Sequence, residues 1–140
     1  MTKFAAALGV LAVALTAVAF ASAGPTKTVM AGAKLDAMQD HATSNGKGVF
    51  TATIKGTKIS WKLTFHGLTG PASAAHIHLG AKGVAGNVLI ALCGPCKGTM
   101  TGTGTITAAV LKDMLKGKTY VNVHTAKFPN GEIRGQIAAH

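Results

Sequence analysis

Three histidines lie on two segments with the alternation typical of β-strands, and their side chains could bind a metal ion. His76 and His78 are two residues apart in Ala-His-Ile-His-Leu, and His124 follows in Tyr-Val-Asn-Val-His-Thr. Because successive side chains of a strand point to opposite faces, His76 and His78 share one face. Neutral imidazole is the commonest metal ligand in proteins. Three imidazoles on adjacent strands would suit copper or zinc, with a position left open for another ligand.

Other polar residues could complete or support this site. His66 lies on the polar side of another alternating segment and is a candidate fourth ligand. Asn122, Glu132 and Arg134 fall on polar strand faces and could orient the imidazoles as outer hydrogen-bond partners. The alternatives are surface histidines bonded to Asn122 or Glu132, and a simple strand-face contact between Glu132 and Arg134. Metal ligation at about 2 Å requires the ring nitrogens to converge to within about 4 Å.

The two cysteines form the tetrad Cys93-Gly94-Pro95-Cys96. In thioredoxin-like proteins this spacing opens a helix whose N-terminus lowers the thiol pKa. Here the tetrad follows an apolar segment, and Lys97-Gly98 does not begin a helix. We therefore expect a small structural disulfide formed in an oxidising compartment, in preference to a redox pair or to thiolate metal ligands.

The start of the chain predicts an export signal over residues 1–23. Met1-Thr2-Lys3 is a short basic start, residues 4–20 are apolar with one threonine, and Ala21-Ser22-Ala23 is a small-residue cleavage site. Cleavage would leave a periplasmic or extracellular protein with no later segment able to span a bilayer. A retained anchor over residues 4–23 is the alternative.

The chain is strongly basic, with 14 lysines and arginines against 4 acidic residues and a net charge of +10. Loss of Lys3 with the signal would lower that charge to +9. The basic residues are scattered, and only 5% of the residues are aromatic. This distribution argues against nucleic-acid binding, which needs a basic stripe or stacking aromatics. An unidentified protein or an anionic surface polymer is the expected partner.

The remaining chain of about 117 residues has the size of one domain. Residues 24–46 are interpreted as a polar leader with a short helix around residues 34–40. Thr107 and Gly117 bound the one helix expected in the domain, and Asn130-Gly131 predicts a hairpin turn. Strands are expected at residues 49–54, 59–66, 74–79, 88–92, 98–105 (strand or loop), 120–125 and 132–138. Short strands with Gly-rich turns and one helix predict an all-β domain over residues 47–140, a small Greek-key-like β-sandwich or barrel.

Three motifs in a fixed order resemble the CHRD domain, the module named after chordin. They are Ala-His-Ile-His-Leu-Gly at 75–80, Tyr-Val-Asn-Val-His-Thr at 120–125 and Phe-Pro-Asn-Gly-Glu-Ile-Arg-Gly-Gln-Ile at 128–137. The resemblance covers roughly residues 48–138 and implies a β-sandwich carried on secreted proteins. It implies no settled activity. The Cys-rich modules that accompany the domain in chordin are absent, so growth-factor antagonism is not expected here.

The His-x-His motif is also similar, more weakly, to copper–zinc superoxide dismutases. That resemblance implies copper ligation by His76 and His78, a later ligand at His124 and an anion-guiding role for Arg134. The bridging histidine and the zinc ligands of that family have no counterpart in this chain.

The sequence therefore predicts an exported binding module with a mononuclear copper or zinc site at His76, His78 and His124. Two alternatives stay open. One is a copper-only dismutase that uses the same histidines, and the other is a structural or adhesive surface protein without metal.

Overall fold

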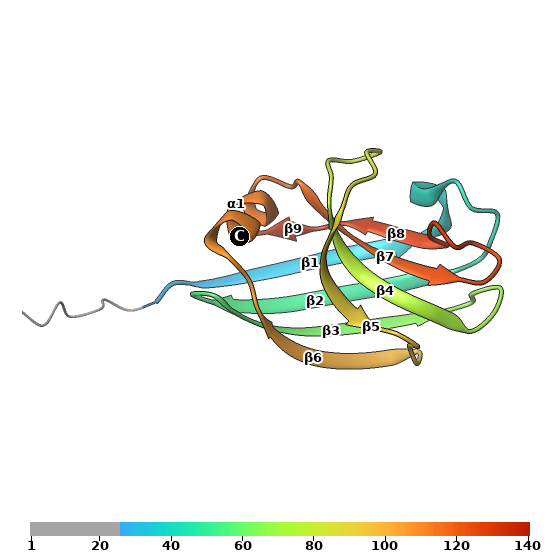
Figure 1. Cartoon of the computed structure of the whole chain (residues 1–140), viewed down its shortest axis with the longest axis horizontal. Helices are drawn as coiled ribbons and strands as arrows, with labels where there is room; N and C mark the ends of the chain where they lie inside the picture. Colours follow the sequence, from blue (N-terminus) through green and yellow to red (C-terminus); the bar gives the residue numbers. More distant parts are fainter. Residues whose placement is uncertain (1–25) are drawn as a thin grey trace, which may run out of the picture.

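The computed structural model describes residues 26–140, so the expected signal over residues 1–23 lies outside the described part of the chain. The described part is built from strands, one α-helix and one short 3-10 helix (Figure 1). In chain order the elements are β1 (Thr28–Asp36), η1 (Ala37–Asp40), β2 (Lys47–Lys55), β3 (Lys58–His66), β4 (Ala72–Leu79), β5 (Val88–Cys93), β6 (Thr99–Thr105), α1 (Ala108–Leu115), β7 (Thr119–Thr125), β8 (Ile133–Gln136) and β9 (Ala138–Ala139).

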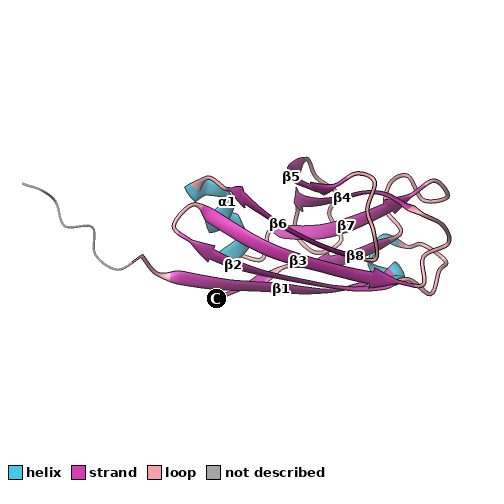
Figure 2. Ribbon diagram, turned by 90° about the horizontal axis from the view of Figure 1, so that it is seen from below, coloured by secondary structure: helices cyan, strands magenta, loops and turns pink. Residues whose placement is uncertain are grey.

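The strands form one antiparallel sheet that folds over on itself into a nearly closed barrel. Their order is β5-β4-β7-β8-β1-β2-β3-β6, and β9 also pairs with β1. Figure 2 shows two layers, with β4, β5 and β7 above β1, β2 and β3. Residues 96–98 bridge the two layers through backbone pairing with β4 on one side and β3 on the other. There Ala72 pairs with Cys96, and the amide of Phe65 donates to the carbonyl of Gly98.

The core lies between the layers and is lined by the apolar residues of each alternating strand. Burial along β2 and β3 alternates residue by residue, as period-two hydrophobicity requires. The aromatic side chain of Trp61 needs its neighbours to be small, and its strand partners are Ala52 and Gly102. A methyl group on Gly102 would overlap the indole. Among the largest fully buried side chains are Phe50, Ile54, Leu63, Ile77, Met114 and Ile133.

The expected all-β class and most of the expected strands are confirmed. The helix is also confirmed: Thr107 caps α1 by accepting a hydrogen bond from the amide of Val110 at 3.2 Å. Of the apolar side chains of α1, Met114 is fully buried and Leu115 is 49% exposed. The Asn130-Gly131 dipeptide lies in the loop that joins β7 to β8, two antiparallel neighbours.

The structure differs from expectation over residues 28–40, where a polar leader with a short helix at 34–40 was predicted. Residues 28–36 form strand β1, which lies inside the sheet between β2 and β8, and only 37–40 form a 3-10 helix. The inward side chains of β1 are Val29, Ala31, Ala33 and Leu35. Two of these are alanines, which have low β-propensity, so the strand has a weak sequence signal. Pairing with β2 along its whole length overrides that propensity.

Glu132 joins two loops through a buried hydrogen-bond network rather than lying on an exposed strand face. Its carboxylate accepts hydrogen bonds from the hydroxyl of Thr125 at 2.6 Å and from the amide and hydroxyl of Thr69 at 2.8 and 2.9 Å. Burial alone would raise the pKa of Glu132, but hydrogen bonds led by that from Thr125 outweigh it and lower the pKa.

We expect Glu132→Gln to reduce the free energy of unfolding by about 2 kcal/mol at pH 7, because hydrogen bonds to a charged group are lost. Because the pKa of Glu132 is lowered on folding, the unfolded chain takes up this proton at about pH 4.3, before the folded state does as the pH falls. Wild-type stability should therefore fall as the pH drops from there through the lowered pKa, and this part of the acid dependence should be missing in the variant. Urea unfolding between pH 7 and 3 measures both effects. Asp113→Asn, with the same charge change, should keep the wild-type profile, and equal profiles for Glu132→Gln and wild type would contradict the prediction.

Candidate metal centre

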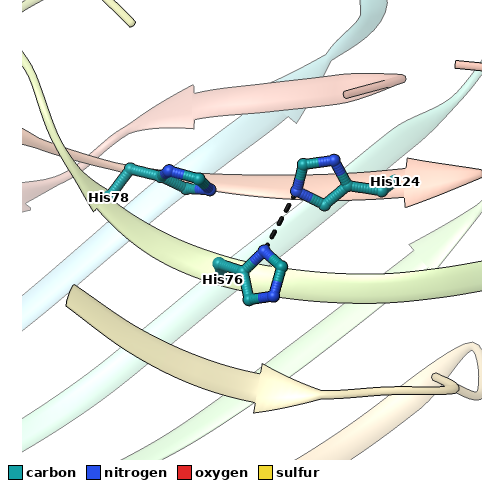
Figure 3. Close-up of side chains that lie close together, drawn as sticks. All are labelled: His76, His78 and His124. Atoms are coloured by element: carbon teal, nitrogen blue, oxygen red, sulfur yellow. Dashed lines mark hydrogen bonds between the residues drawn. The ribbon is translucent and has the colours of Figure 1, made fainter. Parts of the chain in front are cut away.

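Strand register brings the three histidines to one patch on the outer face of β4 and β7. In the antiparallel pairing His78 is opposite Tyr120, His76 is opposite Asn122 and His124 is opposite Ala74. His76 and His124 are therefore diagonal neighbours, and Figure 3 shows their rings turned toward each other. The expected outward phase of the histidines is confirmed. The face is covered by loops, however, and His78 is only 8% exposed.

The three imidazoles offer one nitrogen each to a common space. Nδ1 of His76 lies 3.1 Å from Nε2 of His124, and the three nitrogens of the cluster all lie within 4.8 Å of one another. Two nitrogens bonded to one zinc ion at about 2.1 Å are at most about 4.2 Å apart. The closest pair satisfies that limit, whereas the 4.8 Å that bounds the whole cluster exceeds it, so a bound ion would require the rings to move closer together.

Two backbone carbonyls fix which nitrogens carry lone pairs. Nδ1 of His78 is 3.0 Å from the carbonyl oxygen of Gly86, and Nδ1 of His124 is 2.9 Å from that of Pro129. A carbonyl oxygen can only accept, so each Nδ1 carries the proton and each Nε2 keeps a lone pair. Nε2 of His78 is buried and has no hydrogen-bond partner in the described structure. A buried nitrogen with an unused lone pair is costly unless something binds it.

The surroundings of the cluster favour neutral imidazoles. Burial lowers the pKa of His76, and the nearby rings of His124 and His78 lower it further. Burial also lowers the pKa of His78, although its hydrogen bond to Gly86 opposes the shift. Neutral imidazole is the form that ligates metals, so both side chains are ready ligands at neutral pH.

Tyr120 links the histidine cluster to Arg134. Its ring stacks on that of His78, with centroids 4.9 Å apart and planes 5° apart. The guanidinium carbon of Arg134 lies 3.4 Å from the centre of the same tyrosine ring, a cation–π contact. Arg134 is 4% exposed and does not contact the imidazoles directly.

The other predicted site residues occupy different positions. His66 is exposed at the end of β3, in the other layer, and does not belong to the cluster. Glu132 bonds to Thr69 and Thr125 rather than to His124. Asn122 lies on the same face as the histidines, but its amide donates to the carbonyl of Asn130 at 3.2 Å.

Sequence reasoning missed Asp40, which follows β1 in the segment interpreted as a leader. Its Oδ2 and the Oδ1 of Asn122 are both buried without a hydrogen-bond partner, and both would overlap a side chain at Gly131. Gly131 also has a φ of 132°, which disfavours other residues. Burial raises the pKa of Asp40. The chain signal that could have found this contact is the Asn130-Gly131 dipeptide, whose glycine leaves room for the two polar side chains.

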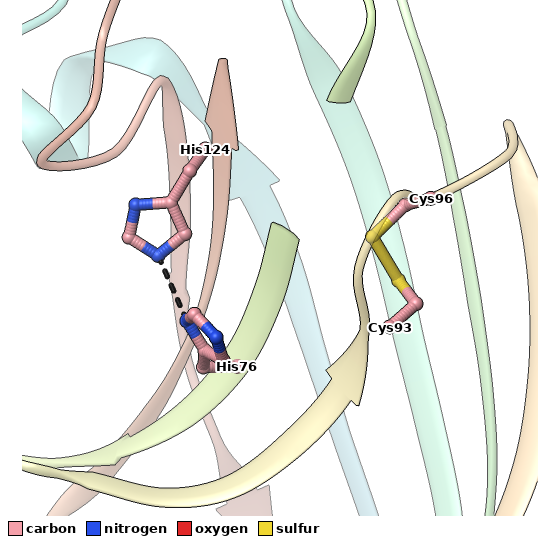
Figure 4. The surroundings of a disulfide bond; sticks show 4 residues. All are labelled: His76, Cys93, Cys96 and His124. Atoms are coloured by element: carbon pink, nitrogen blue, oxygen red, sulfur yellow. Dashed lines mark hydrogen bonds between the residues drawn. A yellow bond between two sulfur atoms is a disulfide. The ribbon is translucent and has the colours of Figure 1, made fainter. Parts of the chain in front are cut away.

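The cysteines form the expected disulfide, Cys93–Cys96, at the end of β5 (Figure 4). Neither sulfur belongs to the group of side chains close enough to share a metal ion. The disulfide lies where the chain leaves β5 and crosses to β6, and Cys96 pairs with Ala72 of β4. It closes a four-residue turn at the point where the chain leaves the layer of β4 and β5.

The fold and the site define an all-β domain with a half-buried cluster of three histidines on its outer face. The family model of the CHRD domain matches residues 26–137, and the chain therefore belongs to the CHRD domain family. The match includes β1, within the segment interpreted as a leader. No curated protein and no solved structure shows a significant match. Among the described residues, no helix has the length and apolar character needed to cross a membrane.

We expect all three imidazoles of the metal-free protein to carry their proton on Nδ1. Carbonyl oxygens accept from His78 and His124, and His76 must then donate from Nδ1 to the free Nε2 of His124. Long-range ¹H–¹⁵N correlation spectra at pH 7.5 distinguish the two tautomers directly. Exposed His66, which lies outside the cluster, serves as the internal reference. A proton on Nε2 of His78 or His124 would contradict the assignment.

Proposed function

We propose that this CHRD-domain protein is an exported binding module that holds one copper or zinc ion. The ligands would be Nδ1 of His76 and Nε2 of His78 and His124. The observation that carries the proposal is that one nitrogen from each of the three imidazoles lies within 4.8 Å of the others, while the buried Nε2 of His78 has no hydrogen-bond partner in the described structure. Export is supported by the signal-like start of the chain and by the Cys93–Cys96 disulfide.

The chain's own residues support ligation in three ways. The carbonyls of Gly86 and Pro129 hold two imidazoles in the ligating tautomer, an arrangement typical of metal-bound histidines. Stacking on Tyr120 restricts rotation of the His78 ring. The proton of His76 can move from Nδ1 to Nε2, so a metal ion can replace the hydrogen bond to His124 without net proton release. A bound copper ion would supply one-electron redox chemistry, and zinc would supply a Lewis acid.

Titration calorimetry with Cu²⁺ and with Zn²⁺ tests the proposal. The wild-type protein should bind one equivalent of at least one of these metals. The double variant His76→Ala/His78→Ala should lose at least about 100-fold in affinity, because two of three ligands are gone. Metal binding should also raise the melting temperature of the wild type but not that of the variant.

His66→Ala is the matched control, because it removes an exposed imidazole outside the cluster. It should leave affinity and stoichiometry unchanged. Equal uptake by the wild type and the double variant would mean that exposed histidines bind the metal nonspecifically. That outcome would overturn the proposed site.

Superoxide turnover is a second candidate function, supported by a cationic guanidinium one aromatic ring away from His78. Only the copper-loaded protein is relevant to it, since zinc has no redox chemistry. If the site is catalytic, the loaded wild type should consume superoxide faster than an equal concentration of free copper, and His66→Ala should match it. A rate no higher than that of free copper would leave binding as the function.

A further inference from the structure

A cavity lies between η1 and the loop over residues 80–87, and Arg134 is one of the residues that line it. It has a volume of about 590 Å³. Figure 1 shows η1 and this loop rising on the same side of the molecule as β8. Cavities that bind small organic molecules typically have volumes of 300–1,000 Å³, whereas one water molecule occupies about 30 Å³. The size is therefore that of an organic ligand.

The charge of the cavity is strongly positive. Lys34 of β1, Lys82 of the loop and Arg134 of β8 all line it, and His41 adds an imidazole. Asp36 is the one acidic residue among the lining residues. Its carboxylate is already occupied, since Oδ1 accepts a hydrogen bond from the amide of Gln39 at 3.1 Å and so caps η1.

Arg134 is 4% exposed, and no described carboxylate lies within ion-pair distance of its guanidinium. Its Nη2 donates to the carbonyls of Ala81 and Val84 at 2.9 and 3.0 Å. The side-chain oxygen of Gln136 lies 3.5 Å from the same nitrogen. Within the described structure, Nε and Nη1 make no hydrogen bond, and neither is among the fully buried unpartnered atoms. Nε and Nη1 are on either side of Cδ and do not share an edge, so each leaves single N–H groups without a partner. A buried charge without a counter-ion is costly, so these N–H groups favour an anion.

Two acids lie near Arg134, but neither forms an ion pair with it in the described structure. Asp36 is paired with Arg134 across the strands, yet its side chain turns to η1. Asp40 is buried near Asn122, and burial raises the pKa of its carboxyl group, although the nearby charge of Arg134 opposes that rise. The glutamines that line the cavity are also occupied: Gln136 donates to the carbonyls of Gly80 and Gly117, and Gln39 accepts from the amide of Gln136. The cationic groups thus remain as the free binding groups.

We propose that this cavity binds a small organic polycarboxylate. Arg134, Lys34 and Lys82 each offer one cationic contact to the cavity, so a ligand with several carboxylates could pair with all three. A monatomic or diatomic anion would fill only a small part of the cavity, so we infer a larger, organic anion. The proposal requires no metal at the histidines.

Calorimetry on the metal-free full chain in 0.15 M NaCl tests the proposal, with tricarballylate (propane-1,2,3-tricarboxylate) as the probe. We expect saturable 1:1 binding, with acetate at least about tenfold weaker because it can make only one of the three contacts. Inorganic phosphate should also bind more weakly than tricarballylate. Phosphate binding as tight as that of tricarballylate would overturn the carboxylate assignment.

Lys34→Ala and Lys82→Ala are the informative variants, because both lysines are exposed while Arg134 also holds the loop in place. Each should weaken tricarballylate binding by about fivefold, the effect of one partly exposed ion pair. Lys112→Ala, an exposed helix position with the same charge change, should bind like the wild type. Equal weakening in all three variants, or heats that never saturate, would show general charge attraction and overturn the site.

Discussion

The register of β4 against β7 is the constraint on which the polar face of this domain depends. A one-residue slip of β4 would turn His76 and His78 into the core and bring Ile77 to the surface. A slip of β7 would do the same to His124 and to Val121 and Val123. The apolar residues on the inner face therefore hold the imidazoles in place on the outer face. Strand β8 continues this arrangement, because Asn122 is opposite Arg134 in the next pairing. One set of core contacts thus positions both the histidine cluster and the arginine.

The loop over residues 80–87 is the second organising element, because it contacts both sites. Gly86 accepts from Nδ1 of His78 and donates its amide to the hydroxyl of Tyr120 at 3.2 Å. Ala81 and Val84 accept from the guanidinium of Arg134. The loop is therefore fixed in place by hydrogen bonds to the histidine cluster and to the arginine at once.

The sequence was sufficient for features with a strong local pattern. Alternation identified the strand of Trp61 and the outward phase of His76 and His78, and the resemblance of three motifs identified the family. The sequence was insufficient where the structure depends on small side chains or on pairing with residues far away in the chain. The alanines of β1 have little β-propensity, and their strand exists because β2 and β8 pair with it. His66 has the same alternation as the ligand candidates, but sheet order places it in the other layer. The pattern of side chains also cannot predict which loop carbonyl, such as that of Gly86, accepts a hydrogen bond from an imidazole.

The position of β1 has a consequence for how the domain folds. β1 is the first strand of the described chain, yet it pairs with β8 and β9, the last two, as well as with β2. Gly32 is opposite Ala138, a contact that spans nearly the whole domain. Such long-range pairings delay folding, because a long loop must close before they form. The nascent chain can form its β1–β2–β3 meander early, but the outer face that carries the histidines is complete only after residues 133–139 have been synthesised.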